Sequence, residues 1–513
     1  MKKFHENLVG KSLALIALLL ICCKTLWAQP DLNKLDAYYQ KALQDWNVPG
    51  MSIGIVKDGK LVFAKGYGTM EAGKNQTPDE NTLYAIASNS KAFTSAAIAM
   101  LVQEGKIAWD DKVKKYLPYF ELYDRYVSDE TTVRDLLCHR VGLGTFSGDV
   151  IWYRSDLTAE EIIRRLKYLP KAYDFRSGYG YSNVMYVTAG EIIKTVTGKT
   201  WGEYITEKIL KPLGMSRTVY ATRFLPGLSN VATPHEFLDG KNKPIPWVDW
   251  ETVAATGGLI SSVQDLAQWL ILNMNHGIRG KDTLLTKTSR NTLWTPHNNF
   301  PVDHTEKNAL THFRGYALGW GISDYQGKMR IGHTGGYDGM ISTIQMLPDE
   351  NLGFIMLTNG LQAPIGALPN YTFDAFLGKD SRDWSKEQLE NLARNKKSDT
   401  RIEDRKKARV MGTQSTLPAD RYAGTYYANI YGNIKVTHHA GQLKIDFEHT
   451  PDFSATLRHW HYDVYELVWD KPQAWFQLGT VRFVLDNNLK VTGLEFDVPN
   501  DDIFFEELKA VRK

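Results

Sequence analysis

The chain is poor in cysteine, with three cysteines among 513 residues. Two of them, Cys22 and Cys23, lie in the N-terminal segment described below, so only Cys138 belongs to the body of the chain. A single cysteine forms no internal disulfide, which excludes a disulfide-stapled scaffold. Because 43% of the residues are hydrophobic, a packed core can supply the stability instead. We interpret Cys138 as a buried thiol.

The chain also lacks an excess of charge of either sign. Residues 1–28 hold four basic residues and one acidic residue, and the remainder holds 57 basic and 57 acidic residues. No uninterrupted run of five like charges occurs. Binding to nucleic acid or to an anionic membrane surface needs a basic patch, so neither is predicted as a partner. We expect a small-molecule or peptide substrate and leave a homo-oligomer open.

The N-terminus has the pattern of an export signal. Two lysines follow Met1, an apolar run extends from Leu13 to Cys23, and cleavage after Ala28 is plausible. The apolar run is too short for a membrane span, so residues 1–28 are predicted to be a signal peptide and the mature chain to have no transmembrane span. The protein is then expected to be periplasmic or secreted. Lipid anchoring at Cys22 or Cys23 is the less favoured alternative, because no small residue precedes either cysteine.

The hydrophobic pattern predicts an α+β fold. Residues 51–56 and 61–67 flank a Lys-Asp-Gly turn as a β-hairpin, and short β-type runs return at 341–347 and 352–357. Between about residues 84 and 300 the pattern is mainly helical. An early hairpin and late strands with helices between them indicate one antiparallel sheet built from both ends of a domain, flanked by helices and interrupted by a large helical insertion.

The composition changes twice after this domain. In residues 379–409, 18 of 31 residues are charged, which indicates a solvated helix or linker rather than a packed core. After Leu417, short alternating segments punctuated by turn residues predict a small antiparallel β-barrel. We therefore divide the chain after the signal peptide into a main domain at 29–378, a charged linker at 379–416 and a barrel domain at 417–513.

The chain contains a single S-x-x-K sequence, from Ser88 to Lys91. The apolar residues that follow recur at helical spacing up to Gly105, which predicts a helix beginning near Ser88. Lys91, almost one turn later, would lie beside the Ser88 hydroxyl at a helix end that favours developing negative charge. This predicts a serine nucleophile activated by a lysine. The alternative is an ordinary helix start that matches the motif by chance.

A second cluster, Tyr181-Ser182-Asn183, lies in a Gly-rich loop before an apolar helix. Alternate residues there can point the same way. An adjacent lysine ammonium favours the anionic form of a phenol, so Tyr181 is predicted to take the Ser88 proton. Asn183 offers a donor and an acceptor to a substrate amide. The alternative is that these residues only form a loop and a helix cap.

A third cluster, Gly332-His333-Thr334-Gly335-Gly336, precedes the predicted strand at 341. Glycines at a strand edge let a substrate backbone approach and pair with it. The Gly336 N–H is predicted to share an oxyanion hole with the Ser88 N–H. His333, Thr334 and Gly335 are predicted to bind the substrate, for example through a carboxylate. The alternative is a tight turn with a hydrogen-bonded histidine.

No metal site and no cofactor are predicted. His438 and His439 are adjacent, and His459 and His461 could share one face of a strand. Neither pair is accompanied by a cysteine or carboxylate pattern typical of a metal site. We therefore expect these histidines to belong to the barrel's packing or surface.

In this order, Ser88-x-x-Lys91, Tyr181-x-Asn183 and His333-Thr334-Gly335 resemble the three motifs of the serine β-lactamase and penicillin-binding superfamily. The likeness covers about residues 33–378. It is to the branch of class C β-lactamases, D-alanyl-D-alanine carboxypeptidases, D-aminopeptidases and related esterases. The tail, with Tyr422-x-Gly424-x-Tyr426, resembles the lipocalin-like domain appended to many such hydrolases.

The resemblance implies a serine hydrolase that forms an acyl-enzyme. A peptidase or amidase on D-amino-acid-containing or cell-wall-type peptides is the first interpretation, and an esterase or transacylase is the second. A non-catalytic penicillin-binding sensor or wall-binding protein is the third. Class C β-lactamases usually have lysine where His333 stands, so the resemblance implies that β-lactamase activity is weak or absent.

Overall fold

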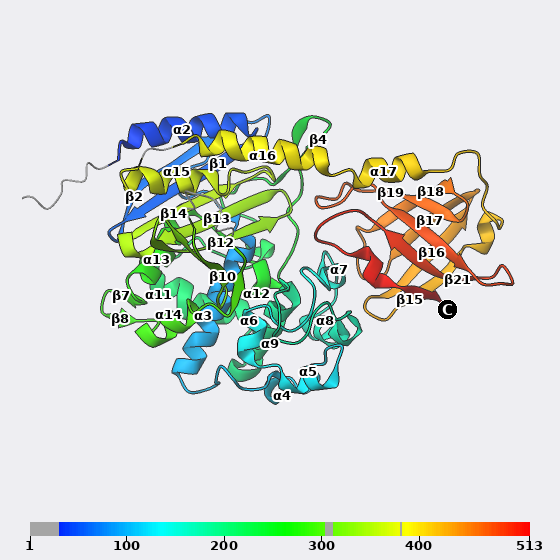
Figure 1. The fold of residues 1–513 in the computed structure, drawn as a ribbon, viewed down its shortest axis with the longest axis horizontal. Helices are drawn as coiled ribbons and strands as arrows, with labels where there is room; N and C mark the ends of the chain where they lie inside the picture. The colour runs from blue at the N-terminus through cyan, green and yellow to red at the C-terminus, as the bar shows by residue number, and fades with distance from the viewer. Residues whose placement is uncertain (1–29, 303–310, 380–381) are drawn as a thin grey trace, which may run out of the picture.

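The computed structural model describes residues 30–302, 311–379 and 382–513. The predicted signal peptide, with Cys22 and Cys23, therefore lies outside the described residues. The chain forms a large sheet-and-helix domain and a smaller β-barrel beside it (Figure 1). No helix of the described part is both long enough and apolar enough to cross a bilayer.

The predicted α+β sheet is confirmed as one antiparallel sheet of eight strands. Strands from the two ends of the domain are neighbours in it, because β1 pairs with β14, with Met51 opposite Thr358. In spatial order the strands are β2 (Lys60–Gly68), β1 (Gly50–Lys57), β14 (Leu352–Thr358), β13 (Met340–Leu347), β12 (Lys328–Tyr337), β11 (Gly321–Tyr325), β10 (Arg314–Tyr316) and β9 (Asn298–Phe300).

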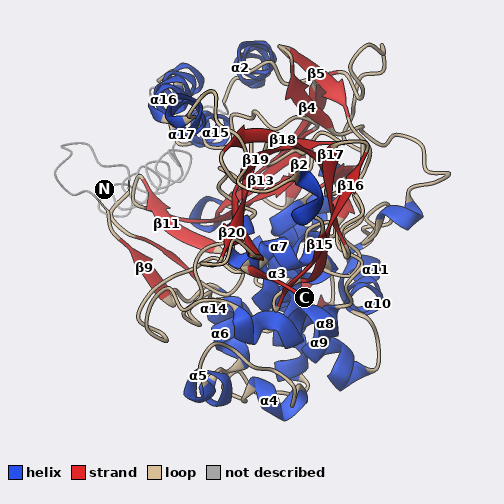
Figure 2. Ribbon diagram, turned by 90° about the vertical axis from the view of Figure 1, so that its right-hand side faces the viewer, coloured by secondary structure: helices blue, strands red, loops and turns tan. Residues whose placement is uncertain are grey.

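Helices cover both faces of this sheet, as Figures 1 and 2 show. Side chains alternate along β1, so Met51, Ile53 and Ile55 pack with one layer of helices while the intervening residues face the other. Gly54 allows close packing on that second face, since a Cβ there would lie 2.4 Å from Val263 Cγ1. The first layer contains α2 (Leu32–Asp45), α15 (Ala367–Phe376) and α16 (Trp384–Ser398), and the second contains α3 (Ser90–Gln103) and α13 (Val263–Met274).

The insertion between β2 and β9 is helical, as predicted. Many of its helices are short and begin at a polar cap; at Thr132, for example, the hydroxyl and Asp135 cap each other's backbone N–H groups. These helices are α4 (Val113–Tyr116), α5 (Arg125–Glu130), α6 (Val133–Leu137), α7 (Asp149–Trp152), α8 (Ala159–Arg165), α9 (Asn183–Thr197), α10 (Trp201–Ile205), α11 (Lys211–Leu213), α12 (Ala254–Gly257) and α14 (Lys287–Leu293). Three two-stranded ribbons accompany them: β3 (Tyr84–Ala85) with β6 (Ile260–Ser261), β4 (His235–Leu238) with β5 (Lys241–Pro244), and β7 (Ile278–Arg279) with β8 (Asp282–Thr283).

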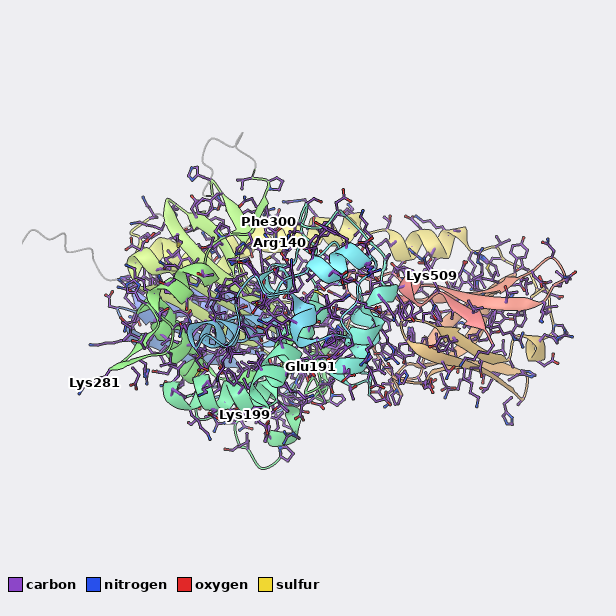
Figure 3. All side chains as sticks on the ribbon, turned by 90° about the horizontal axis from the view of Figure 1, so that it is seen from below. Arg140, Glu191, Lys199, Lys281, Phe300 and Lys509 are labelled. Carbon is purple, nitrogen blue, oxygen red and sulfur yellow. The ribbon has the colours of Figure 1, made fainter. Side chains whose placement is uncertain are left out.

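The charged segment is helical: α16 packs on the sheet domain and α17 (Arg401–Ala408) leads to the barrel (Figure 1). The tail forms a closed antiparallel barrel, which confirms a barrel at the C-terminus. Its strands are β15 (Gly424–Ala428), β16 (Gly432–His439), β17 (Gln442–Phe447), β18 (Ser454–His461), β19 (Val464–Trp469), β20 (Thr480–Leu485), β21 (Val491–Asp497) and β22 (Ala510–Arg512). In Figure 3, Lys509 marks the end of the barrel that adjoins the sheet domain, and Phe300 marks β9.

Candidate active site

Ser88 lies in a single 3₁₀ turn, Ala87–Asn89, immediately before α3. Ala87 has a φ of 46°, a left-handed conformation that a residue with a side chain rarely adopts. Such strain is typical of positions where a tight turn presents a functional group. The predicted helix therefore begins two residues later than Ser88, and Ser88 projects from the turn into a cavity.

Lys91 is fully buried in the first turn of α3 and points back at Ser88. Its Nζ lies 2.9 Å from Ser88 Oγ, 2.8 Å from Asn183 Oδ1 and 2.8 Å from the Thr256 carbonyl oxygen. Burial lowers the pKa of Lys91 well below its ordinary value, although Asp149 nearby acts in the opposite direction. Burial thus makes the free amine, which can accept a proton, easier to reach beside the serine hydroxyl than it is in water.

Asn183 is the first residue of α9, and its amide is held on three sides. Its Oδ1 accepts from Lys91 Nζ and, at 2.8 Å, from Thr256 Oγ1, while its Nδ2 donates to Asp149 Oδ2 at 2.6 Å. Asn183 thus fixes the lysine in this state of the site. A substrate amide that binds Asn183, as predicted, would have to compete with Lys91, Thr256 and Asp149 for the Asn183 side chain.

Tyr181 lies beside the same lysine, whose Nζ is 4.8 Å from the centre of the phenol ring. Its hydroxyl oxygen is buried and has no hydrogen-bond partner in the described part of the chain. Burial raises the pKa of Tyr181 well above its ordinary value, and the nearby Ser88 hydroxyl offsets only part of this. The sequence predicted an anionic phenol. The structure gives the opposite direction, because loss of water on burial dominates and favours the neutral phenol.

His333 faces Tyr181 and Tyr316 from strand β12. Its Nδ1 is 2.6 Å from the Thr334 carbonyl oxygen, which can only accept, so Nε2 accepts from the Tyr316 hydroxyl at 3.0 Å. Burial and the neighbouring Lys91 lower the pKa of His333 to about 4. His333 is therefore neutral at pH 7, unlike a lysine in the same place.

Strand β12 has an open edge next to Ser88. Strand β11 pairs with β12 only as far as Gly332, which leaves residues 333–337 without a strand partner on that side among the described residues. Gly335 packs on the Ser88 turn, since a Cβ there would be 2.2 Å from the Ile86 carbonyl oxygen and 3.0 Å from the Ser88 nitrogen. Gly336 and Thr334 line the cavity with Ser88, so the three predicted motifs meet at one place.

This cavity has a volume of about 950 Å³ and an aromatic wall. The barrel closes part of it. Trp475 lies against Gly336, whose Cβ would be 3.1 Å from the indole, and Asp502 and Ile503 also line the space. Burial raises the pKa of Asp502 to about 6.

A barrel carboxylate also holds the loop in front of α7. Glu507 accepts from Ser147 Oγ at 2.5 Å and from the Gly148 N–H at 2.9 Å. The next residue along the chain is Asp149, which contacts Asn183. The barrel therefore packs against the site, in addition to being joined to the sheet domain through the linker.

Sequence reasoning missed Asp149 and Thr256, which hold Asn183, and the three cavity residues of the barrel. Asp149 is 3% exposed and accepts from both Asn183 Nδ2 and, at 2.8 Å, Trp152 Nε1. No motif marks it in the sequence. The sequence also holds one G-x-S-x-G, residues 50–54, a spacing that can mark a nucleophile elbow. It lies within β1, where Ser52 is fully buried and donates to the Asp79 carbonyl oxygen, so it presents no nucleophile.

Solved structures share this architecture. The octameric penicillin-binding protein homologue from Pyrococcus abyssi has a TM-score of 0.61 and 23% identity, covering 94% of this chain and all of that one. A D-stereospecific amidohydrolase from a Streptomyces species has a TM-score of 0.54 and 23% identity, covering 68% of this chain and all of that one. At such identities the likeness shows the fold alone.

Sequence comparisons are more specific. The chain is 30% identical over 424 residues to the unguisins hydrolase ungD' of Aspergillus campestris, which covers 77% of this chain and 76% of that protein. A family model described as Beta-lactamase matches residues 35–376, and a model described as a domain of unknown function (DUF3471) matches residues 408–512. The chain therefore belongs to the Beta-lactamase family of serine hydrolases.

Proposed function

We propose that this protein is an exported serine peptidase or amidase that acts through an acyl-enzyme on D-amino-acid-containing or cell-wall-type peptides. The observation that carries the proposal is the contact of 2.9 Å between Lys91 Nζ and Ser88 Oγ on the wall of a large cavity. A buried amine of lowered pKa is a base that can activate a serine at neutral pH.

Acylation begins when the Ser88 hydroxyl gives its proton to the Lys91 amine and Oγ bonds to the substrate carbonyl carbon. The Ser88 and Gly336 N–H groups are the predicted oxyanion donors. Tyr181, a neutral phenol with a free buried hydroxyl, is placed to pass the proton from Lys91 to the leaving nitrogen. The carbon–nitrogen bond then breaks and leaves an ester on Ser88. In the second half, water adds to the ester, and its proton returns to Ser88 Oγ through the same base.

The open edge of β12 supports a peptide substrate. An extended peptide can add there as a further strand, with its carbonyl carbon next to Ser88. The family relationship to an unguisins hydrolase supports hydrolysis, and the fold shared with a D-stereospecific amidohydrolase supports an amide bond as the target. The aromatic cavity wall favours an esterase on small apolar esters as the second candidate.

The substrate class can be tested with matched pairs. We expect a D-alanyl-D-alanine peptide to be hydrolysed with a kcat/KM at least about 100-fold above that of its L,L-diastereomer, because a preformed site that orients the scissile bond accepts one configuration. Short-chain p-nitrophenyl esters and a penicillin are measured in parallel. Protein inactivated beforehand with a fluorophosphonate serves as the blank. Turnover of esters without turnover of either peptide would replace the proposal with the esterase.

Asp149→Asn should slow the reaction of Ser88 with a fluorophosphonate by roughly 10- to 100-fold. Two donors, Asn183 Nδ2 and Trp152 Nε1, point at the two carboxylate oxygens. An amide offers one oxygen, so one donor is left unpaired at a cost of about 1–3 kcal/mol, and Asn183 loses its fixed orientation against Lys91. The measurement is the labelling rate followed by intact mass.

Asp156→Asn is the matched control for this variant. Asp156 is a carboxylate of the same region that contacts His449 of the barrel and has no contact with Asn183. It should label at the wild-type rate. Equal labelling of the two variants would show that Asp149 does not position the site.

A further inference from the structure

The hydroxyl of Tyr181 does not hold its own side chain in place. Its oxygen is buried and has no hydrogen-bond partner in the described part of the chain. The proposed proton transfer nevertheless needs the phenol beside Lys91, whose Nζ is 4.8 Å from the ring centre. The position of the phenol must therefore be set by its backbone and by the groups that pack on its ring. Both lead to His139, two residues beyond the end of α6.

His139 binds the backbone on both sides of Tyr181. Its carbonyl oxygen accepts from the Gly180 N–H at 3.1 Å, and its Nδ1 accepts from the Ser182 N–H at 3.0 Å. Ser182 is fully buried, so its N–H would have no water as a substitute if Nδ1 were removed. Because Asn183 follows directly and begins α9, the same hydrogen bond also fixes the start of that helix.

The His139 ring also packs on the phenol. The ring centres of His139 and Tyr181 are 4.3 Å apart, and their planes are inclined by 37°. The ring centre of Tyr316, whose hydroxyl donates to His333, is 4.8 Å from that of His139. His139 thus contacts the tyrosine of the second motif and the tyrosine that holds the histidine of the third.

The His139 side chain is a neutral acceptor in an uncommon backbone conformation. The Ser182 N–H can only donate, so Nδ1 carries no proton and the ring proton is on Nε2. Burial and, to a smaller extent, Lys91 lower the pKa of His139 well below its ordinary value, so the ring is neutral at pH 7. Its φ of 61° lies in the left-handed region, and its Nε2 is buried without a hydrogen-bond partner among the described residues. An apolar side chain would fill this space without an unpaired N–H, so the histidine is of use through the bond that its other nitrogen makes.

We infer that His139 is a positioning residue for Tyr181, and that the acceptor at Nδ1, rather than the volume of the ring, keeps the phenol beside Lys91. The inference rests on the proposed function, because it takes Tyr181 as the group that passes the proton from Lys91 to the leaving group. Reactions whose leaving group must be protonated then depend on His139. Reactions whose leaving group departs as a stable anion do not.

Two variants separate the acceptor from the volume. In His139→Asn, Oδ1 is bonded to Cγ as Nδ1 is in histidine, so it can accept from the Ser182 N–H, and asparagine tolerates the left-handed conformation. His139→Phe keeps an aromatic ring and accepts nothing. If His139 only fills space, His139→Asn should be the more damaging change. If it positions Tyr181 through Ser182, His139→Phe should be.

The readout is a ratio of two kcat/KM values, one for N-acetyl-D-alanyl-D-alanine and one for the p-nitrophenyl ester of N-acetyl-D-alanine. An amine leaves only after it is protonated, whereas p-nitrophenolate leaves as the anion, and the ratio does not depend on how much of the protein has folded. We expect His139→Phe to lower the ratio by about 10- to 100-fold, since misplacing a catalytic group by about 1 Å can cost 100-fold, and His139→Asn to stay within about threefold of the wild type. An unchanged ratio in His139→Phe, or a larger loss in His139→Asn, would overturn the inference.

The ethyl ester of N-acetyl-D-alanine distinguishes failure of this inference from failure of the proposed function. Ethoxide also needs a proton in order to leave, so an esterase should show the same loss in the ratio of ethyl to p-nitrophenyl ester. That loss, without amide hydrolysis by the wild type, would reject the proposed peptidase and keep the role of His139. Amide hydrolysis with an unchanged ratio in His139→Phe would keep the peptidase and reject the role. Turnover of neither the amide nor the ethyl ester would reject both.

His235→Phe is the matched control. His235 is also fully buried, its Nε2 accepts from the Ala72 N–H at 2.9 Å, and its Nδ1 lies 2.9 Å from the Asn359 carbonyl oxygen. It is not among the residues that line the cavity. Its replacement removes a buried bond to a backbone N–H of the same kind, so the free energy of unfolding should fall while the ratio stays at the wild-type value. A fluorophosphonate, which expels fluoride, should label Ser88 at the wild-type rate in all three variants.

Discussion

Ser88→Ala is expected to abolish peptide hydrolysis and all covalent labelling by a fluorophosphonate or a penicillin probe. Removal of the nucleophile from a serine hydrolase costs on the order of 10⁴- to 10⁶-fold in kcat, because binding and oxyanion donors alone leave only a small residual rate. The measurement is intact mass after labelling, followed by peptide mapping of the adduct on the wild type, together with kcat/KM for the D-peptide.

Ser90→Ala, two residues further along the chain, is the control. Ser90 is fully buried, and its hydroxyl accepts from the Leu259 N–H at 3.1 Å instead of facing the cavity. Its loss can lower the free energy of unfolding, but the protein that folds should still be labelled on Ser88. Undiminished labelling of Ser88→Ala would remove Ser88 from the mechanism.

The site could be predicted from sequence where a short motif fixes local geometry. Ser88 and Lys91 are nearly one helical turn apart, so their contact follows from the backbone alone. The meeting of this pair with Tyr181 and His333 did not follow from spacing, since the three motifs are far apart along the chain. It was expected because the motifs resemble those of a known superfamily, and the structure places them on one cavity.

What could not be predicted depends on burial. How far Tyr181 is removed from water cannot be seen in the sequence, and this burial decides that its phenol stays protonated. Asp149 and Thr256 stand in stretches of ordinary composition, and they matter because folding brings them to Asn183.

The contacts between the C-terminal barrel and the sheet domain could not be predicted either. Alternating hydrophobicity and turn residues predicted a barrel, which is observed. They did not predict that Trp475 and Asp502 would close the cavity or that Glu507 would hold the loop before Asp149. Such contacts depend on how the two domains pack together. The hydrophobic pattern within either domain does not encode this packing.

Lys91→Met should reduce the labelling rate of Ser88 and peptide hydrolysis by at least about 10³-fold, because the thioether fills the space of the amine but accepts no proton. In the wild type, the rate should rise with pH as Lys91 loses its proton. Burial lowers the pKa of Lys91, so the midpoint of this rise should lie well below 10.5, the ordinary value. The measurement is the pH dependence of the labelling rate for both proteins.

Lys91→Arg separates the two roles that a lysine can have here. A guanidinium keeps the positive charge and can donate to Ser88, Asn183 and the Thr256 carbonyl, but it does not lose its proton at accessible pH. If Lys91 is the base, Lys91→Arg should be as inactive as Lys91→Met; if it acts only as a cation, Lys91→Arg should keep much of the rate and show no rise with pH. Lys106→Met is the control for loss of a lysine: Lys106 is exposed, lies just beyond the C-terminal end of α3 and pairs with Glu104. This variant should keep the wild-type profile. An active Lys91→Met would show that Lys91 is not the base and would return that role to Tyr181, which lines the same cavity.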